Sequence, residues 1–249
     1  MVLKDISLPS PSENILYDEV LLYLAEQEEQ GEFLRFWESG DFFVVLGKTS
    51  DPVEDLYIER IEDDKIPVLR RASGGGTVLQ GKGCLNYSLV LSKDRSPELP
   101  MIKKSYQYIL GKITNALSSL GIKAQYHPIS DMAIGEKKFS GNAQKRGKKF
   151  ILHHGTLLYD FPLEGIERYL KIPKQIPEYR RGRVHTDFLA NISAGAEELK
   201  RAIAKEFNAV EKEETVNPPE RKALNSFLQT RNIVVDLKKM SKSALRVGT

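Results

Sequence analysis

The chain of 249 residues has very little cysteine, and its only thiol is Cys84. A single cysteine excludes an intramolecular disulfide, which favours a reducing compartment and a cytoplasmic protein. No apolar run approaches the roughly 18 residues of a membrane span. The opening residues MVLKDISLPSPSEN also lack the apolar stretch of a secretory signal. We therefore expect a protein that neither crosses a membrane nor is secreted.

Strong net charge and metal-binding motifs are also missing. The net charge is only +3, so bulk charge does not predict nucleic-acid binding. Two basic clusters remain, KRGKK at 145–149 and RRGR at 180–183. Each is either solvated loop charge or a surface that attracts an acidic partner protein or phosphates. The sequence has no His-x-x-x-His or Cys-x-x-Cys spacing, so we expect no protein metal site. Gly-x-Ser-x-Gly, the motif of a serine nucleophile, is absent too.

The order of apolar patterns predicts the fold class. Periodic apolar residues predict helices over about 12–31, 102–121 and 196–207. Between them lie strand-like runs, including EFLRFW, DFFVVLG, IPVLRR, CLNYSLVL and FILHHGTLLYD. Strands in the middle with helices at either side predict an α+β fold. We expect mixed, mostly antiparallel β-sheets flanked by helices that pack on one face.

The composition changes after Asn208, where the charged stretch VEKEETVNPPERKAL begins. We expect residues 1–208 to form the main domain and residues 209–249 a short C-terminal extension. A short helix and the strand-like run NIVVDL lie in this extension, which either completes the main domain or forms a small appendage.

Three consecutive glycines, Gly74, Gly75 and Gly76, stand within the stretch RRASGGGTVLQGKGCLNYSLVL. They lie between two predicted strands, so the pattern is neither a Walker P-loop nor a dinucleotide-binding motif. A flexible hairpin turn is the simplest interpretation. The adjacent Arg71 and Ser73 favour an anion site instead. Backbone without side chains lets a ligand approach its N–H groups, and an arginine fork suits phosphate or carboxylate.

A second polar cluster is EKKFSGNAQKRGKKFILHHGTLLYD, residues 136–160. Lys137 and Lys138 are adjacent, so on a strand they point to opposite faces and one can face a site. A lysine held near an anion stays charged and stabilises negative charge in a transition state. His153 and His154 alternate in the same way, and buried structural histidines are their simplest interpretation.

The three motifs RRASGGGTVLQGKGCLNYSLVL, KKFSGNAQ and HHGTLLYD, in this order, resemble the lipoate–protein ligase catalytic domain. That domain belongs to the biotin and lipoate ligase superfamily, and the resemblance covers about residues 12–204. It implies a fold like that of class II aminoacyl-tRNA synthetases and biotin ligases. It also implies activation of lipoate or octanoate by ATP to an acyl-adenylate, with Mg²⁺ at the phosphates. The acyl group then passes to a lysine of a lipoyl-domain acceptor, such as a 2-oxoacid dehydrogenase E2 or the glycine-cleavage H protein.

The resemblance also assigns roles to individual residues. Lys138 falls on the family's characteristic lysine near the carboxylate and α-phosphate, and Arg71 on its arginine. His154 falls near the acyl chain, and Trp37 resembles an aromatic at the dithiolane end. The other substrate- or ATP-binding positions that it implies are Ser73, Gly74, Gly75, Gly76, Thr77, Val78, Leu79, Cys84, Asn86, Ser140 and Gly141. Apolar strand residues such as Val78 and Leu89 are expected to line a narrow acyl tunnel.

Two departures from the family pattern affect the nucleotide contacts. Gln80 and Gly81 stand where members often have His-Asp, and Cys84 stands where many have Asn or Asp. The extension is also shorter than the accessory domain of the large bacterial ligases, so this protein either uses a separate accessory subunit or needs none. Two alternatives remain, an ATP-independent octanoyl or lipoyl transferase of the same fold and a non-catalytic lipoyl-binding protein. Cys84 lies at neither cysteine position of the transferases, which favours the ligase.

Overall fold

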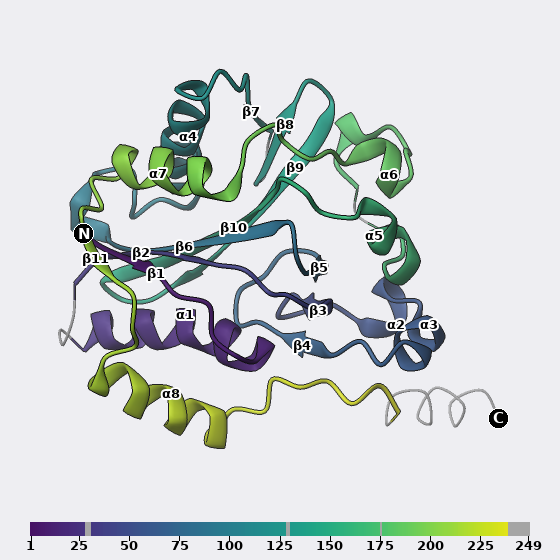
Figure 1. Ribbon diagram of the computed structural model, residues 1–249, viewed down its shortest axis with the longest axis horizontal. Helices are drawn as coiled ribbons and strands as arrows, with labels where there is room; N and C mark the ends of the chain where they lie inside the picture. Colours follow the sequence, from purple (N-terminus) through teal and green to yellow (C-terminus); the bar gives the residue numbers. More distant parts are fainter. Residues whose placement is uncertain (28–30, 128–129, 175, 239–249) are drawn as a thin grey trace.

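A large mixed sheet runs through the middle of the protein (Figure 1). The computed structural model describes residues 1–27, 31–127, 130–174 and 176–238. The strands of this sheet are β1 (Val2–Asp5), β2 (Phe33–Trp37), β6 (Cys84–Ser92), β7 (Gln125–His127), β8 (Asp131–Ile134), β9 (Lys137–Arg146), β10 (Phe150–Leu158) and β11 (Glu211–Glu213). They lie in the order β11-β1-β2-β6-β10-β9-β8-β7, parallel from β11 to β2 and antiparallel beyond. The predicted α+β class with a mostly antiparallel sheet is confirmed.

Helices cover both faces of this sheet, so the expectation of helices on one face is wrong (Figure 1). One face carries α4 (Ile102–Ser118) and α7 (Ala196–Glu206), and the other carries α1 (Pro11–Glu26) and α8 (Pro218–Thr230). In β6, Leu89 and Leu91 pack with α4 and α7, whereas Val90 packs with α1 and α8. Continuous apolar runs such as CLNYSLVL are typical of strands buried on both faces.

Capping chemistry sets where the first predicted helix begins. α1 begins at Pro11, one residue before the predicted start, because Ser10 is the N-cap and forms a capping box with Glu13. It ends at Glu26, five residues before the expected Gly31. Over the ranges that the structure describes, no helix is both long and apolar enough to cross a bilayer.

A second, three-stranded sheet stands at one end of the large sheet. Its order is β4 (Val68–Arg70), β3 (Phe43–Leu46) and β5 (Val78–Gln80). Around it lie α2 (Pro52–Asp55), α3 (Ile58–Asp63), α5 (Leu163–Tyr169) and α6 (His185–Phe188), and the remaining short elements are 3₁₀ turns at Lys93–Arg95 and Glu178–Arg180. Because β3 separates β4 from β5, the glycine segment between them crosses the end of β3. The hairpin-turn interpretation of the glycines is therefore wrong.

The described part of the C-terminal extension packs against the rest of the chain. β11 adds an edge strand beside β1, and α8 lies along α1. Glu220 of α8 is fully buried, accepts a hydrogen bond from the Tyr17 hydroxyl at 2.6 Å and pairs with the Lys4 ammonium at 2.8 Å. The run NIVVDL forms one isolated bridge, Val234 to Leu69, instead of the predicted strand. The boundary at residue 208 stays a prediction.

Candidate functional site

Several of the predicted polar residues gather on the face of the large sheet that α1 covers. On this face His154 of β10 lies between Ser88 of β6 and Ala143 of β9. The glycine segment passes over β9 here, since a Cβ added at Gly75 would lie 3.7 Å from the Ala143 Cβ. The structure thus brings the glycine motif into contact with the strands that carry KKFSGNAQ and HHGTLLYD.

Glycine is required at the centre of this segment by its backbone angle, and at Gly47 by the close approach of the segment. Gly75 has φ +87°, and a Cβ added at Gly47 would lie 2.0 Å from the Gly75 carbonyl oxygen. Gly74, Gly75 and Gly76 are all exposed. Within the described parts of the chain, no group accepts a hydrogen bond from their N–H groups. These donors are therefore open to a ligand.

Arg71 is a buried cation that holds the glycine segment. Its Nη2 donates to the carbonyls of Gly74 at 2.7 Å and Gly76 at 2.8 Å, and its Nη1 lies 3.3 Å from the Val45 carbonyl. Burial lowers the pKa of Arg71 to about 10, so the group is still charged at neutral pH. Among the residues with described positions, no carboxylate forms an ion pair with it. A buried guanidinium without a carboxylate partner favours an incoming anion.

A hydrogen-bonded chain links Arg71 to His154. The Arg71 Nε donates to the Ser73 hydroxyl at 3.0 Å, and that hydroxyl lies 2.6 Å from the His154 Nε2. Burial, helped by the charge of Arg71, lowers the pKa of His154 to about 3, so the ring is neutral. Ser73 then donates to Nε2, and the tautomer inferred from this contact points its Nδ1 proton toward Asp18, 4.0 Å away.

Sequence reasoning missed the charged residues behind His154. Asp18 of α1 pairs with the fully buried Arg35 of β2 at 2.7 Å and accepts a hydrogen bond from Ser88 at 2.6 Å. Both charges stand in mostly apolar stretches, YDEVLLYL and FLRFW. A charge in such a run predicts a buried partner, because an unpaired buried charge is costly. That pattern was the available indication of this pair.

A β-bulge turns Lys138 onto the same face. Asp131 pairs with Gly141 and Met132 with Ser140, but Ala133 pairs with Lys138. The extra residue, Phe139, places Lys138 on the face of Gly141 instead of that of Ser140. Lys137 is exposed on the opposite face, so the expectation that the two lysines point to opposite faces is confirmed.

The Lys138 ammonium is fixed by an acidic partner that the sequence reasoning did not identify. Its Nζ lies 2.7 Å from Asp131 Oδ1, and the Tyr179 hydroxyl donates to Asp131 Oδ2 at 2.9 Å. The same Nζ lies 3.3 Å from the position of a Cβ added at Gly141. Lys138 thus lies over Gly141, two residues along β9 from the place where the glycine segment crosses.

Farther along this face, a small cavity lies beside Lys145. Lys145 pairs with Glu19 of α1 at 2.8 Å. The cavity measures about 10 Å³, roughly the space of one water molecule. An acyl chain therefore requires the lining to move apart. That lining consists of Ile15, Asp18, Glu19, Arg71, Ala72, Ser73, Lys145, Leu152 and His154.

Several of the other predicted residues lie apart from this group. The Thr77 hydroxyl donates to Asp55, and Leu79 packs in the core of the small sheet. Ser140 lies on the α4 face of the large sheet, bonded to Asn142 at 3.1 Å. Leu89 packs on the α4 face too, whereas Val78 packs beside Trp37 near α1. Val78 and Leu89 therefore cannot line one tunnel, and that expectation is wrong.

Trp37 lies next to the cavity in a buried apolar cluster. Its ring stacks on Phe43 with centroids 6.4 Å apart, and both pack with Ile15, which lines the cavity. The buried Trp37 Nε1 has no hydrogen-bond partner within the described residues.

The two departures from the family pattern contact each other. The Cys84 thiol donates to the Gln80 side-chain oxygen at 3.3 Å, and the Asn86 amide donates to the same oxygen at 2.9 Å. Burial raises the pKa of the Cys84 thiol well above its usual range. The Gln80 oxygen therefore accepts hydrogen bonds from both Cys84 and Asn86, and the thiol is not activated as a nucleophile.

The two basic clusters are mostly structural. Arg146 Nη2 donates to the Leu99 carbonyl at 2.6 Å, and Lys145 pairs with Glu19. In the second cluster the buried Arg180 lies over the Phe188 ring, whereas the Arg181 side chain is 70% exposed and pairs with Glu136. Neither cluster is therefore only solvated loop charge, because part of each is held by contacts within the protein.

Known proteins share this fold and part of this sequence. The chain is 31% identical over 164 residues to a probable lipoate-protein ligase A of Mycoplasma pneumoniae, covering 66% of this chain and 47% of the relative. A bi-partite lipoate protein ligase of Thermoplasma acidophilum, analysed with its E2 lipoyl domain, has a TM-score of 0.76 and 23% identity over 92% of each chain. A lipoate-protein ligase A bound with ATP has a TM-score of 0.75 and 22% identity, covering 93% of this chain and 94% of that one. These two structural likenesses show the fold.

The sequence relatives are longer than this chain, which spans about half the length of the curated relatives it matches. The match to the family itself is broader. The model of the lipoyl protein ligase A/B catalytic domain matches residues 10–208. The chain therefore belongs to the lipoyl protein ligase A/B catalytic-domain family.

Proposed function

We propose that the chain is the catalytic part of a lipoate–protein ligase. It activates lipoate or octanoate with ATP and transfers the acyl group to a lysine of a lipoyl-domain protein. One arrangement carries the proposal. Lys138 and Arg71 lie along one face of β9, beside a glycine segment whose N–H groups are open.

The arrangement suits the first chemical step. A carboxylate oxygen of the acid attacks the α-phosphorus, a new O–P bond forms, and pyrophosphate leaves. Two anions must approach each other, so the cations Lys138 and Arg71 reduce the repulsion and stabilise the charge that develops. The open N–H groups of Gly74, Gly75 and Gly76 suit the phosphate oxygens.

The second step needs no nucleophile from the enzyme. The acceptor lysine, as a free amine, attacks the carbonyl of the mixed anhydride, AMP leaves with the bond electrons, and the proton that the amine nitrogen loses passes to solvent. The neutral His154, fixed by Ser73, suits the environment of the uncharged acyl chain.

We propose that Mg²⁺ reaches the site bound to the triphosphate. The described residues contain no group of three or more His, Cys, Asp or Glu side chains placed to hold a metal. Mg²⁺ usually keeps several waters and binds substrate phosphates together with one or two carboxylates. Asp131, beside Lys138, is a carboxylate of this kind.

The acceptor belongs to the proposal as well. We infer an acidic lipoyl domain of a 2-oxoacid dehydrogenase E2 or a glycine-cleavage H protein. The likeness to a ligase that was analysed with its E2 lipoyl domain supports this choice. The bi-partite nature of that ligase supports a separate accessory subunit.

The alternative functions have less support. A thioester transferase would need Cys84 as nucleophile. This thiol is buried and hydrogen-bonded to Gln80, and burial raises its pKa. A non-catalytic lipoyl-binding protein would not need Lys138 fixed on the ligand face by Asp131.

Pyrophosphate release with lipoate, ATP and Mg²⁺ tests the proposal. Lys138→Ala should abolish release while the protein stays folded by circular dichroism, and Cys84→Ser should retain it. Release that persists in Lys138→Ala would refute the assignment. Transfer that occurs only from an acyl-carrier protein, and is lost in Cys84→Ser, would establish the transferase instead.

A further inference from the structure

Arg231 lies outside residues 10–208 that match the family model, yet it pairs with a residue that lines the cavity of the site. Its guanidinium pairs with Glu19, and the same Glu19 Oε2 lies 2.8 Å from the Lys145 ammonium. Glu19 and Lys145 both line the cavity. A residue of the C-terminal extension thus completes an ion-pair cluster at the end of the cavity away from Lys138.

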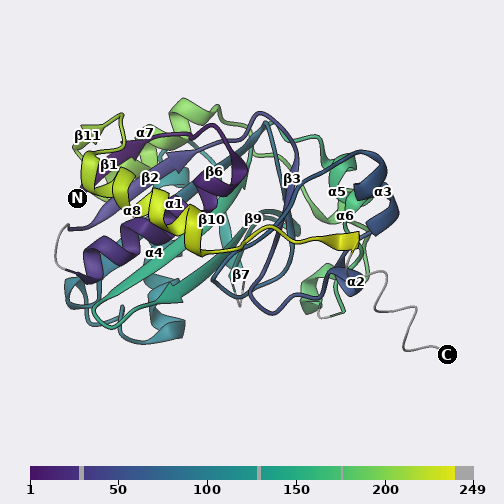
Figure 2. The ribbon, with the colours of Figure 1, turned by 90° about the horizontal axis from the view of Figure 1, so that it is seen from below.

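The extension holds Arg231 from both sides. Before it, α8 packs on α1, and the Arg231 guanidinium lies 3.7 Å from the centroid of the Phe227 ring. After it, the chain runs along β4, where the Ile233 carbonyl accepts a hydrogen bond from the Arg70 N–H at 2.8 Å. Figure 2 shows this segment leaving α8 and crossing toward the small sheet. The position of Arg231 is therefore set by the same β4 that leads into the glycine segment.

Glu19 needs both cations because of where it lies. The residue is only 6% exposed, and an uncompensated buried carboxylate is costly. Lys145 and Arg231 share one carboxylate oxygen, which holds the group at the wall of the cavity. Without Arg231, Glu19 keeps one partner and its carboxylate becomes free to turn toward the cavity. An anion there would oppose an apolar chain.

We propose that Arg231 is a positioning residue that sets how far an acyl chain extends into the site, by holding Glu19 at the cavity wall. The inference rests on the proposed function, in which the carboxylate end of the acid lies near Lys138 and Arg71. Lys138 lies over Gly141, and Lys145 stands four residues farther along β9, roughly 13 Å away. An extended eight-carbon acid whose carboxylate lies within hydrogen-bond distance of Lys138 ends close to Glu19, whereas a six-carbon acid ends two carbons short of it.

A chain-length series tests this inference. In Arg231→Gln, the KM for octanoate and lipoate in pyrophosphate release should rise about fivefold, the effect expected from losing a partly exposed ion pair. The KM values for hexanoate and for ATP should stay unchanged, because hexanoate does not reach Glu19. Arg231→Lys should bring the KM for octanoate and lipoate most of the way back to the wild-type value. In a Glu19→Gln background, Arg231→Gln should have no further effect, because the carboxylate that it controls is gone.

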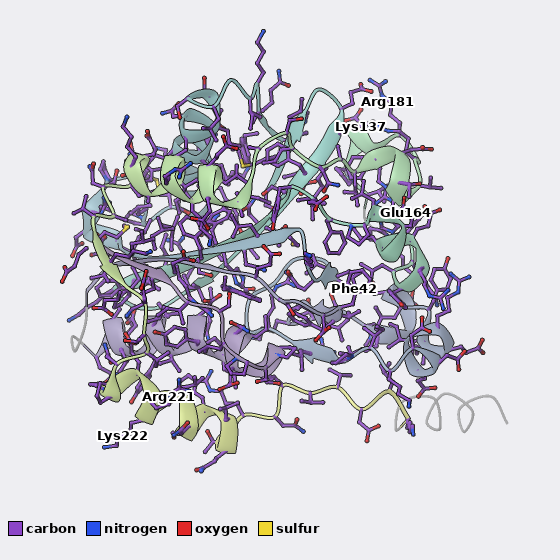
Figure 3. The ribbon with its side chains drawn as sticks, viewed as in Figure 1. Phe42, Lys137, Glu164, Arg181, Arg221 and Lys222 are labelled. Atoms are coloured by element: carbon purple, nitrogen blue, oxygen red, sulfur yellow. The ribbon has the colours of Figure 1, made fainter. Side chains whose placement is uncertain are left out.

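Arg221→Gln is the matched control. Arg221 also lies on α8 (Figure 3) and pairs with Glu13 of α1 at 3.6 Å, and neither residue lines the cavity. It should leave every KM and the melting temperature unchanged. An Arg231→Gln variant that shifts KM equally for all three acids, or for none, would overturn the inference alone. Wild-type protein that releases no pyrophosphate with any acid, even when the inferred accessory subunit is present, would overturn the proposed function as well.

Discussion

The Lys138 ammonium and the Asp131 carboxylate lie 2.7 Å apart on adjacent strands, brought together by a β-bulge at Phe139. Tyr179 holds the other Asp131 oxygen from the 3₁₀ turn at Glu178–Arg180. The carboxylate is therefore fixed from two sides, and it in turn fixes the lysine that we propose to meet the substrate carboxylate.

Asp131→Asn should lower kcat for pyrophosphate release by about 10- to 100-fold, since a hydrogen bond to a charged group contributes roughly 1.5–3 kcal/mol. The amide still fills the space, so folding should be unaffected. Glu136→Gln is the control, because it removes a nearby exposed ion pair with Arg181. A wild-type rate in Asp131→Asn would show that Lys138 needs no positioning by this carboxylate.

Gly141→Ala should disturb Lys138 without unfolding the protein. The added Cβ would lie 3.3 Å from Nζ and 3.4 Å from Cε of Lys138, so the flexible end of the lysine must shift. We expect a several-fold lower kcat with an unchanged melting temperature. Gly40→Ala is the control, because nothing lies within 4 Å of its added Cβ. Equal rates for the two variants would contradict the placement of Lys138 over Gly141.

His153 should make the protein less stable as the pH falls below about 6.5. Burial lowers its pKa from 6.5 to about 3, so between these values the unfolded chain takes up a proton that the folded protein excludes. The stabilisation is complete above pH 6.5 and is lost progressively down to about pH 3. In His153→Gln, the loss of unfolding free energy between pH 7.5 and 5.5 should be smaller by about 1 kcal/mol. Urea unfolding at the two pH values measures this, and an unchanged difference would refute it.

Acceptor recognition should depend on the basic side chains that remain exposed near the site. Lys137 and Arg181 lie close together in Figure 3, whereas Arg221 and Lys222 lie at the opposite side on α8. Lys137→Glu with Arg181→Glu should raise the KM for an acidic lipoyl domain several-fold, with pyrophosphate release unchanged. The matched reversal, Arg221→Glu with Lys222→Glu, should have no effect on either. A similar loss in both pairs would indicate a general charge effect instead of a docking surface.

Part of the site could be predicted from the sequence because its residues stand in motifs. Arg71, Ser73 and His154 belong to two such motifs, and the structure joins them by hydrogen bonds of 3.0 and 2.6 Å. The apolar periodicity of α4 and α7 likewise predicted both helices, because each has one buried face.

Other parts depend on contacts that a local pattern does not contain. The bulge that turns Lys138 is set by pairing with β8, and alternation alone would place Lys138 on the face of Ser140. Leu89 was placed on the wrong face because β6 is buried on both sides, which leaves no polar alternation to indicate direction. Arg231 and Glu19 are separated by most of the chain, so only the packing of α8 on α1 brings them together.

Intact-mass spectrometry of a lipoyl-domain acceptor tests the central claim most directly. The acceptor is incubated with the protein, lipoate and Mg²⁺, with and without ATP, and in parallel with Lys138→Ala. The account predicts a mass increase of one lipoyl group on the acceptor only with ATP and only with an intact Lys138. An equal mass increase without ATP, or with Lys138→Ala, would contradict it.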